Sequence, residues 1–370
     1  MDEEEEAIRY YFRRNYDYNA ILEFLDKYHD IRMSKRTLLN RLRDYGLNRR
    51  NRNIDEDLLR DHINRELQGS GNLLGYRAMW RRLHLKYDIN VPRSAVEELM
   101  REIDPEGVRS RKAHRLKRRK YSNLKPYGLP IHGCIDGFSR RLIWLKVEKS
   151  NNDPRVIANL FKNAIIEIEG CPTLLRTDRG TENAIVSSAQ CFFRRNGTDS
   201  LAGLKAHRFG SSHSNQRIEA WWAFLRRTWS TWWMNFFKDM IHEGHLDASN
   251  KLHLECIWFC FKNLIQNELN GVMEEWNNHY IRKSRFQTAS GIPNNLFFLP
   301  ESVGATDRKH PYNREDMEEI NNELRIPAEN DDSLIYQEYF SYVSQIIRLG
   351  EPSSAREALT LYCRLLVAAQ

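Results

Sequence analysis

The first hundred residues carry apolar side chains at the spacing of α-helices, separated by short polar turns. One apolar stripe predicts a helix over residues 21–28, and a second stripe predicts a helix that starts after Ser34 and stops at Gly46. Ser34 offers a side-chain oxygen to the free N–H groups of a first helical turn, and Gly46 can take the left-handed conformation that ends a helix. The pattern indicates a helix-turn-helix.

The same apolar spacing returns 58 residues further along, where Ile89 takes the place of Ile31. We therefore predict two tandem, all-α helix-turn-helix units, over residues 1–50 and 51–108. The second helix of the first unit carries residue types that contact phosphates and base edges in DNA. Its candidate DNA-binding residues are Lys35, Arg36, Asn40 and Arg41. In the second unit we expect an exposed basic face made by Arg77, Arg81, Arg82 and Lys86.

From residue 125 the pattern changes to short apolar strands that alternate with longer helices, which is typical of an α/β domain. The predicted strands are 131–135, 142–147, 173–177 and 206–209. The predicted helices are 153–169, 182–193, 216–237, 252–269 and 272–282. Aromatic residues surround the helix 216–237, which indicates that it is buried. The domain spans residues 125–300, and an acidic connector with one amphipathic helix follows over residues 301–370.

The charge is distributed unevenly along the chain, although its net value is only +7. Residues 1–120 hold 28 basic and 21 acidic residues, whereas residues 301–370 hold 7 and 13. No acidic residue lies between Glu106 and Asp136, so the linker 109–124 is strongly basic. Such a run is typical of a nucleic-acid contact or a nuclear-import signal, and the alternative is a solvated linker. The candidate DNA-binding residues of the linker are Arg115, Lys117, Arg118, Arg119 and Lys120.

The composition narrows the classes of protein to consider. Hydrophobic residues make up 41% and charged residues 29%, which excludes a disordered chain. Apolar runs such as 257–261 are far shorter than the ~18 residues of a membrane-spanning helix, so we expect no membrane contact. The acidic residues 2–6 differ from the basic start of a targeting peptide, so we expect the nucleus or the cytoplasm. Six cysteines without a C-x-x-C pair favour reduced thiols, and no small-molecule cofactor is expected.

Two acidic residues occupy positions at which α/β domains place their sites. Asp178 follows the predicted strand 173–177 directly and precedes the turn at Gly180, and Glu219 lies 41 positions later near the start of a helix. A strand carboxylate and a helix carboxylate that converge can hold Mg²⁺. Oxygens of water and of phosphate then fill the remaining positions around the ion. Two such ions can clamp the attacking and leaving oxygens of a phosphoryl displacement.

Residues 125–300 resemble the retroviral-type integrase core, and in particular transposon-derived eukaryotic proteins with an integrase core domain. The resemblance rests on Ile131-His-Gly-Cys-Ile-Asp-Gly-Phe-Ser-Arg140, Leu175-Arg-Thr-Asp-Arg-Gly-Thr-Glu-Asn183 and His207-Arg-Phe-Gly-Ser-Ser-His-Ser-Asn-Gln-Arg-Ile-Glu219. It implies a ribonuclease-H-like fold with a D,D,E triad, in which Asp178 and Glu219 match the second and third carboxylates and are metal ligands. It also implies Mg²⁺ or Mn²⁺ as cofactor, DNA as partner, and DNA strand cleavage and transfer as the ancestral activity.

The first carboxylate of that triad has no clear counterpart in this chain. In the family it lies on an opening strand ahead of the hairpin, whereas residues 121–128 lead straight into the hairpin and contain no acid. Asp136 is the nearest acid and the tentative third catalytic residue. We therefore expect an integrase core that lacks its first strand, with impaired catalysis and retained DNA binding. The alternative is a non-catalytic nucleic-acid-binding adaptor or regulator that uses the core as an interaction surface.

Two further expectations concern DNA and assembly. Arg226 lies seven positions after Glu219, two turns along the same helix face, and is a candidate contact to a DNA phosphate. The resemblance is also compatible with a homo-oligomer.

Overall fold

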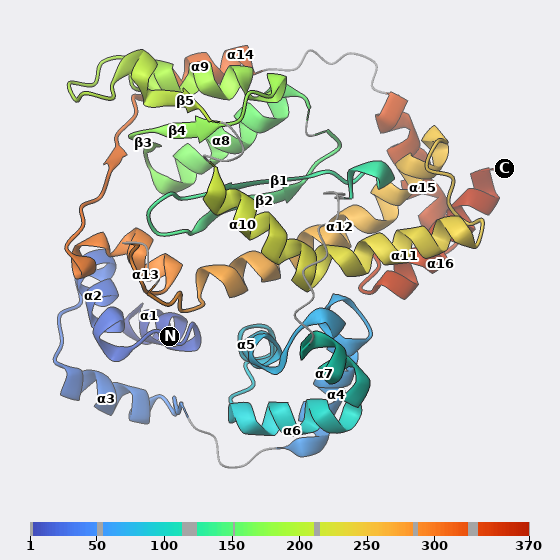
Figure 1. Cartoon of the computed structure of the whole chain (residues 1–370), viewed down its shortest axis with the longest axis horizontal. Helices are drawn as coiled ribbons and strands as arrows, with labels where there is room; N and C mark the ends of the chain where they lie inside the picture. Colours follow the sequence, from blue (N-terminus) through green and yellow to red (C-terminus); the bar gives the residue numbers. More distant parts are fainter. Residues whose placement is uncertain are drawn as a thin grey trace. The chain divides into compact units, whose positions relative to one another are not determined.

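The computed structural model describes residues 3–49, 55–112, 124–150, 152–210, 215–283, 288–324 and 332–369 (Figure 1). The chain is mixed α/β, with N-terminal helices, a central region with short strands and a helical tail. It divides into two compact units. The first combines Met1–Arg119, Phe138–Arg141 and Gly271–Thr306, and the second combines Lys120–Gly137, Leu142–Asn270 and Asp307–Gln370. None of the described helices is both long and apolar enough to cross a membrane.

The helices of the first unit repeat with the period seen in the sequence. They are α1 (Glu3–Arg13), α2 (Tyr18–His29), α3 (Lys35–Asp44), α4 (Glu56–Leu67), α5 (Tyr76–Tyr87), α6 (Arg93–Ile103), α7 (Pro105–Lys112) and α13 (Pro293–Phe298), with 3-10 turns at Ser70–Leu73 and Pro300–Val303. Helices α2 and α5 each end at an aspartate with a φ of 54°, Asp30 and Asp88. The backbone N–H of each aspartate donates to the carbonyl five residues earlier, Leu25 and Leu83. The two turns therefore share one geometry, 58 residues apart.

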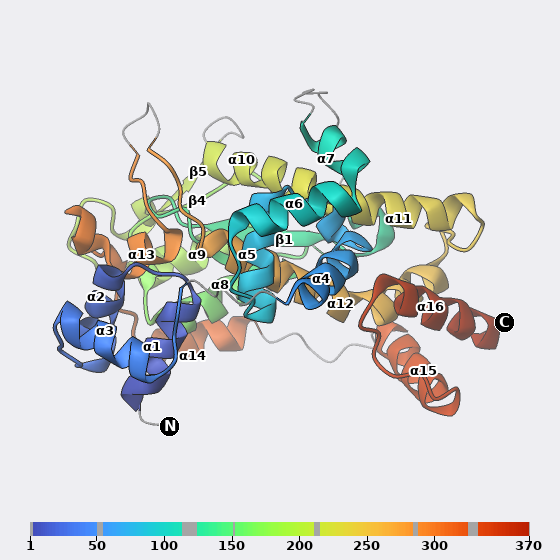
Figure 2. The same cartoon turned by 90° about the horizontal axis from the view of Figure 1, so that it is seen from below.

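Each half of this repeat has its own apolar core. Helices α1 to α3 pack around Ile8, Ile21 and Leu38, and helices α4 to α6 pack around Ile63 and Leu83 (Figures 1 and 2). Ser34 accepts a hydrogen bond from the Thr37 N–H and so begins α3 as predicted. These cores hold both helix pairs in shape, because each short helix buries its apolar stripe against its neighbours.

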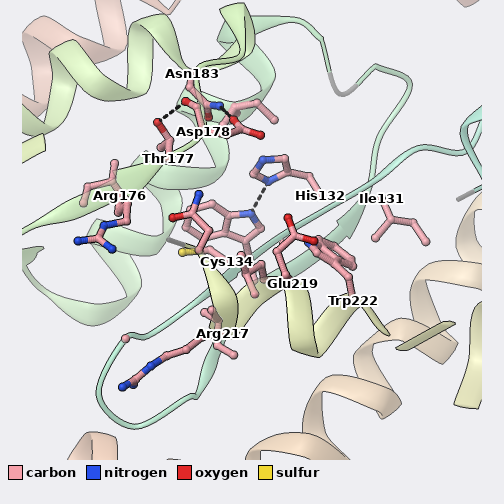
Figure 3. A pocket seen from close by; sticks show the side chains of 18 of the residues that line it. Ile131, His132, Cys134, Arg176, Thr177, Asp178, Asn183, Arg217, Glu219 and Trp222 are labelled. Carbon is pink, nitrogen blue, oxygen red and sulfur yellow. Dashed lines mark hydrogen bonds between the residues drawn. The ribbon is translucent and has the colours of Figure 1, made fainter. Parts of the chain in front are cut away.

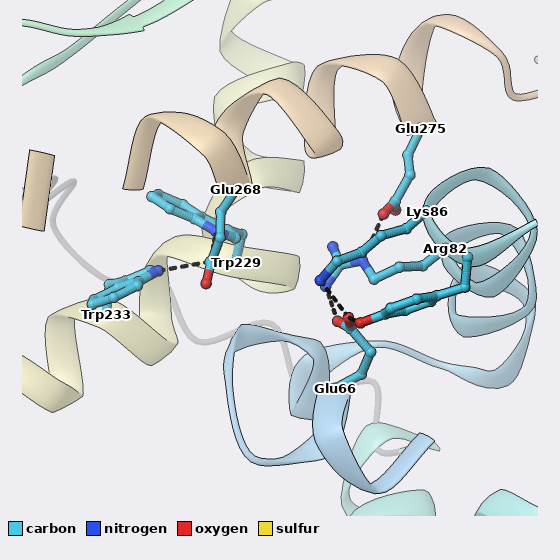
Figure 4. A network of polar contacts seen from close by, with 8 residues as sticks. Glu66, Arg82, Lys86, Trp229, Trp233, Glu268 and Glu275 are labelled. Atoms are coloured by element: carbon cyan, nitrogen blue, oxygen red, sulfur yellow. Dashed lines mark hydrogen bonds and ion pairs between the residues drawn. The ribbon is translucent and has the colours of Figure 1, made fainter. Parts of the chain in front are cut away.

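Arg82 is buried and does not lie on an exposed basic face, so the expectation was wrong for this residue. Arg81 is half-buried, whereas Arg77 and Lys86 are exposed as predicted. Arg82 Nη1 donates to Glu66 at 3.2 Å and its Nε donates to Glu275 at 2.6 Å (Figure 4). Lys86 Nζ and the Tyr87 hydroxyl also donate to Glu66, at 2.7 and 2.6 Å. A buried guanidinium requires such paired carboxylates, since its desolvation would otherwise cost several kcal/mol. This network joins α4, α5 and the last turns of α12 (Lys251–Asn277).

Among the described residues, the second unit has three separate two-stranded sheets. Strands β1 (Ile131–Ile135) and β2 (Leu142–Val147) form an antiparallel hairpin with the predicted bounds. Strands β4 (Leu175–Thr177) and β5 (His207–Phe209) pair in parallel, and β3 (Cys171–Pro172) pairs antiparallel with β6 (Lys309–His310). Strand β4 is two residues shorter than predicted at its start.

Long helices surround these strands. They are α8 (Pro154–Ile168), α9 (Ala184–Phe193), α10 (Gln216–Leu225), α11 (Thr231–His242), α12, α14 (Arg314–Glu323), α15 (Asp332–Ile346) and α16 (Ala355–Ala369), with 3-10 turns at Lys125–Tyr127, Thr181–Asn183 and Gly203–Ala206. A π-helical turn, Arg226–Ser230, joins α10 to α11. Trp221, Trp229 and Trp233 are almost fully buried, which confirms the burial expected for the aromatic helix. The indole N–H groups of Trp229 and Trp233 both donate to Glu268 (Figure 4).

Two predicted helix boundaries were wrong. The two helices expected over residues 252–282 form the single helix α12, because a glycine inside a helix, here Gly271, costs only about 1 kcal/mol and does not have to end it. The single helix expected after the acidic connector is two helices, α15 and α16, which lie side by side (Figures 1 and 2). The connector also packs against the core, where both Nη atoms of Arg195 donate to Asp316.

Candidate active site

A cavity of about 870 Å³ opens in the second unit beside the two predicted catalytic residues. It is lined by all five residues of β1, by residues 174–178 on and around β4, and by one side of α10. Asp178 and Glu219 both line it, and Figure 3 shows their side chains on opposite walls with His132 between them. The fold therefore brings together two acids that are 41 positions apart in the sequence.

Asp178 follows β4 and is exposed, but its side chain is held in place. The Asn183 side-chain amide donates to Asp178 Oδ1 at 2.7 Å and to Glu182 Oε1 at 3.1 Å. Asn183 is buried at the end of a 3-10 turn, directly before α9, so its amide is fixed relative to β4. Asn183 therefore orients the Asp178 carboxylate, and Glu182 lines the same cavity as a further acid.

Glu219 lies in the first turn of α10 and is half-buried. A carboxylate at this position interacts favourably with the positive end of the helix dipole. One helical face of α10 continues from Glu219 through Trp222 to Arg226, and all three residues line the cavity. The π-helical turn begins only at Arg226, so the α-helical register between Glu219 and Arg226 is kept. Arg226 thus lies on the same helix face as Glu219, as the spacing in the sequence predicted.

Asp136 does not line the cavity, although its neighbours Ile135 and Gly137 do. It follows the end of β1 at the start of the hairpin turn. Burial raises the pKa of the adjacent Cys134 thiol to about 12, and the charge of Asp136 adds to this shift. Asp136 therefore lies at the edge of the site, and Glu182 is the third acid that the cavity contains.

His132 is a site residue that the sequence interpretation did not single out. The indole N–H of Trp144 on β2 donates to His132 Nδ1 at 2.9 Å, and the two rings stack with centroids 5.9 Å apart (Figure 3). Burial lowers the pKa of His132 to about 4, and the nearby negative charge of Asp178 only partly opposes this. The imidazole is therefore neutral at pH 7, and its remaining proton is on Nε2. His132 is part of the first quoted motif, but only the cavity lining indicates a role for it.

The acids fit one divalent ion better than two. Mg²⁺ can be held by one or two carboxylates, with water and phosphate oxygens in the remaining positions, and Asp178 and Glu219 offer such a pair. A two-ion site needs further ligands, and the described residues contain no group of three or more His, Cys, Asp or Glu that could hold a metal ion. This set of ligands does not fit a two-ion centre.

The predicted DNA-binding side chains of α3 differ in their surroundings. Lys35, Arg36, Asn40 and Arg41 are all exposed. Arg41 forms an ion pair with Glu4 at 2.7 Å, and Lys35 Nζ lies 5.9 Å from the ring centre of Tyr18. An exposed arginine that is already neutralised offers less attraction to a phosphate. Of these four side chains, Arg36 and Asn40 are the two with no ion pair or cation–π contact to another described residue.

The basic linker falls largely outside the described residues. Arg115, Lys117, Arg118, Arg119 and Lys120 all lie in the segment 113–123, for which the structure gives no placement. His213, within the third motif, is outside the described residues as well.

Comparison with known proteins gives one clear match. Residues 120–300 match the family model of the integrase core domain, a segment that includes both strands of the hairpin, Asp178 and Glu219. No curated protein and no solved structure matches the chain. The family model and the cavity agree on the same part of the second unit. The matched segment, residues 120–300, is thus similar to the integrase core domain and covers just under half of the chain.

Proposed function

We propose that this chain is a transposon-derived, integrase-like protein that binds DNA and whose strand-cleavage and strand-transfer chemistry is impaired. The observation that carries this proposal is the convergence of Asp178 and Glu219 on one cavity inside an integrase core domain. The position of Asp136 outside the cavity lining supports the impairment. The separation of β1 and β4 into different two-stranded sheets supports a ribonuclease-H-like core without its first strand.

The cavity side chains have clear roles in such a site. Asp178 and Glu219 are the carboxylates that would hold Mg²⁺ or Mn²⁺, and integrase core domains typically use divalent metals. Arg226 can bind a phosphate oxygen by charge-assisted hydrogen bonds. The Nε2–H group of His132 can donate a further hydrogen bond without adding charge. Asp136, the candidate for the first triad carboxylate, does not line the cavity, so these groups can bind and orient a phosphodiester better than they can cleave it.

DNA binding is assigned to the N-terminal helices and the basic linker. The tandem units present α3 and α6 after turns of equal geometry, as in proteins with paired helix-turn-helix units. Arg36 and Asn40 are the proposed base-edge or phosphate contacts on α3, helped by Lys35 and Arg41. The segment 109–124 adds phosphate contacts without sequence preference. A protein that binds DNA is expected in the nucleus, or in the cytoplasm if it meets its DNA there.

A non-catalytic adaptor is the second candidate, and exposed apolar residues on α15 favour it. Ile335, Tyr342 and Ile346 are 66%, 65% and 60% exposed. Exposed apolar patches of this kind mark protein–protein contacts. In this case the tail binds a partner, or a second copy of the chain, while the N-terminal helices hold DNA.

A nicking assay on labelled duplex DNA tests the proposal directly. We expect the full chain to shift the DNA in a gel but to produce little cleavage with Mg²⁺ or Mn²⁺. A version with an acid-bearing strand inserted before Lys125 should cleave more, and Asp178→Asn or Glu219→Gln should remove the gain. Robust cleavage by the unmodified chain that is lost in Asp136→Asn would show that Asp136 has taken the first triad role. That result would contradict the proposed impairment.

A further inference from the structure

The cavity beside β1 is bounded by a strand edge with unused backbone hydrogen-bonding groups. The Glu148 N–H donates to the Pro130 carbonyl at 3.0 Å, which identifies residues 130 and 148 as a hydrogen-bonded pair of the hairpin. Such pairs alternate along an antiparallel ladder, so His132 and Cys134 bond to β2. Ile131 and Gly133 then direct their N–H and C=O groups away from β2, toward the cavity. These groups have no hydrogen-bond partner in the part of the chain that the structure describes.

The opposite edge of the same hairpin is closed in a different way. There, Leu145 and Val147 of β2 direct their backbone groups outward. The Gln266 side chain on α12 accepts from the Val147 N–H at 3.0 Å and donates to the Leu145 carbonyl at 3.0 Å. One amide side chain thus takes the place of a neighbouring strand. The edge that faces the cavity has no equivalent side chain among the described residues, which makes it the open edge of the hairpin.

A second strand edge faces the cavity from the other side. The Gly210 N–H donates to the Thr177 carbonyl at 2.8 Å, so Thr177 bonds to the β5 side of the parallel pair. Its neighbours Arg176 and Asp178 direct their backbone groups the other way, because hydrogen bonding alternates along a strand. Both of these residues line the cavity, whereas no residue of β5 does.

The remaining two walls of the cavity carry apolar side chains beside polar ones. Ile157 of α8 and Val186 of α9 line one wall, and both are 2% exposed. Trp222 and Leu225 of α10 line the other wall, next to polar residues of the same helix. Trp222 lies directly over β1, since a Cβ atom added to Gly133 would come within 3.1 Å of its ring. Two strand edges with apolar side chains on the walls between them are typical surroundings of a strand buried inside an α/β domain.

We propose that this cavity binds an extended apolar segment of another polypeptide, which adds as a strand between β1 and β4. Peptide addition to an open strand edge is a recurring mode of recognition, in which the backbone gives affinity and the side-chain pockets give specificity. The cavity volume of about 870 Å³ lies within the range of specific ligand sites. The lining has three acids, Asp178, Glu182 and Glu219, and three arginines, Arg176, Arg217 and Arg226, so without a metal ion it carries no net charge that attracts a polyanion. An uncharged peptide backbone suits such a lining.

The test uses the full chain and a fluorescent synthetic peptide with about seven residues, alternating valine and isoleucine, between lysines that keep it soluble. The matched control peptide has the same side chains but carries N-methyl groups on alternate backbone nitrogens. We expect anisotropy titrations to show at least about tenfold weaker binding of the methylated peptide, because two or three hydrogen bonds are lost. Equal binding of the two peptides would overturn the proposal.

Amide hydrogen exchange locates the peptide within the protein. In the free chain, the amides of Ile131 and Gly133 should exchange much faster than that of Cys134, which bonds to β2. Addition of the peptide should slow Ile131 and Gly133 to the rate of Cys134. Slow exchange of Gly133 in the free chain would show that another segment of the same molecule already fills the edge, and would overturn the proposal.

A cavity-filling variant and a nucleic-acid competitor complete the test. Val186→Phe places a ring in the cavity and should abolish peptide binding, whereas Ser188→Phe, on an exposed position of the same helix, should bind normally. Circular dichroism confirms that both variants fold. Normal peptide binding by a folded Val186→Phe protein would contradict the assignment. Displacement of the peptide by a short single-stranded oligonucleotide in the absence of divalent metal would assign the cavity to nucleic acid and would also contradict the assignment.

Discussion

The indole N–H of Trp144 donates a 2.9 Å hydrogen bond to Nδ1 of His132 and so fixes which nitrogen of that ring carries the proton. An indole N–H can only donate, so Nδ1 must accept and the proton must be on Nε2. Because His132 lines the cavity of Asp178 and Glu219, its tautomer decides what a bound phosphate or peptide meets there. The contact crosses the β1–β2 hairpin and couples the site to its strands.

His132 should make stability depend on pH in a defined window. An unfolded histidine titrates near pH 6.5, whereas burial lowers the pKa of His132 to about 4 in the folded protein. Between these values the unfolded state binds the additional proton, so the free energy of unfolding falls as pH drops from about 6.5 to about 4. We expect His132→Asn, whose Oδ1 can still accept the Trp144 N–H, to remove up to about 3 kcal/mol of this fall.

Urea unfolding at several pH values measures this effect. His242→Asn, at an exposed position, is the matched control and should keep the pH dependence of the parent protein. An unchanged dependence in His132→Asn would mean that the pKa of His132 is about the same in the folded and the unfolded states.

The α3 helix should contribute unequally to DNA affinity. Arg36 is exposed and accessible, whereas Arg41 is paired with Glu4. We expect Arg36→Ala to weaken duplex binding and to lower the slope of log affinity against log salt by about one, as the loss of one phosphate contact does. Arg41→Ala should have a smaller effect. Fluorescence titrations over a series of salt concentrations measure both, and equal effects would show that DNA displaces Glu4 from Arg41.

The basic linker should strengthen DNA binding without preference for any DNA base sequence. Exchange of Arg115, Lys117, Arg118 and Lys120 for glutamate should weaken binding to unrelated duplexes by the same factor, since phosphates carry no sequence information. Gel-shift titrations with several duplexes of equal length provide the measurement. A loss confined to one sequence would instead assign base contacts to the linker, and no loss at all would make it a solvated connector.

Arg82 should be a major source of stability in the first unit. Arg82→Ala leaves Glu66 and Glu275 without their central partner, and removal of one member of a buried ion pair typically costs about 3–5 kcal/mol. The exposed Arg77, on the same helix, is the control, and Arg77→Ala should change stability by less than about 0.5 kcal/mol. Urea unfolding distinguishes the two. Equal effects would show that the network contributes no net stability.

Many local elements of this protein could be predicted from its sequence. The hairpin strands β1 and β2, the start of α8 after Asp153 and the start of α3 after Ser34 all have the bounds that apolar spacing and helix caps indicated. These signals act over a few residues, so no knowledge of distant contacts is needed. The 58-residue repeat could also be recognised from the sequence, because both copies have buried apolar residues at equivalent positions.

The surroundings of single charged and polar side chains were decided by tertiary contacts. Arg82 looked exposed in a basic stretch, yet its partner Glu275 lies 193 positions away and draws it into the interior. His132 became a neutral cavity residue because Trp144 faces it across the hairpin. Burial, protonation and pairing depend on which distant segments meet, whereas caps and periodicity depend only on neighbours. The sequence by itself therefore determined where helices and strands form, and the tertiary structure decided which of their polar groups face one another.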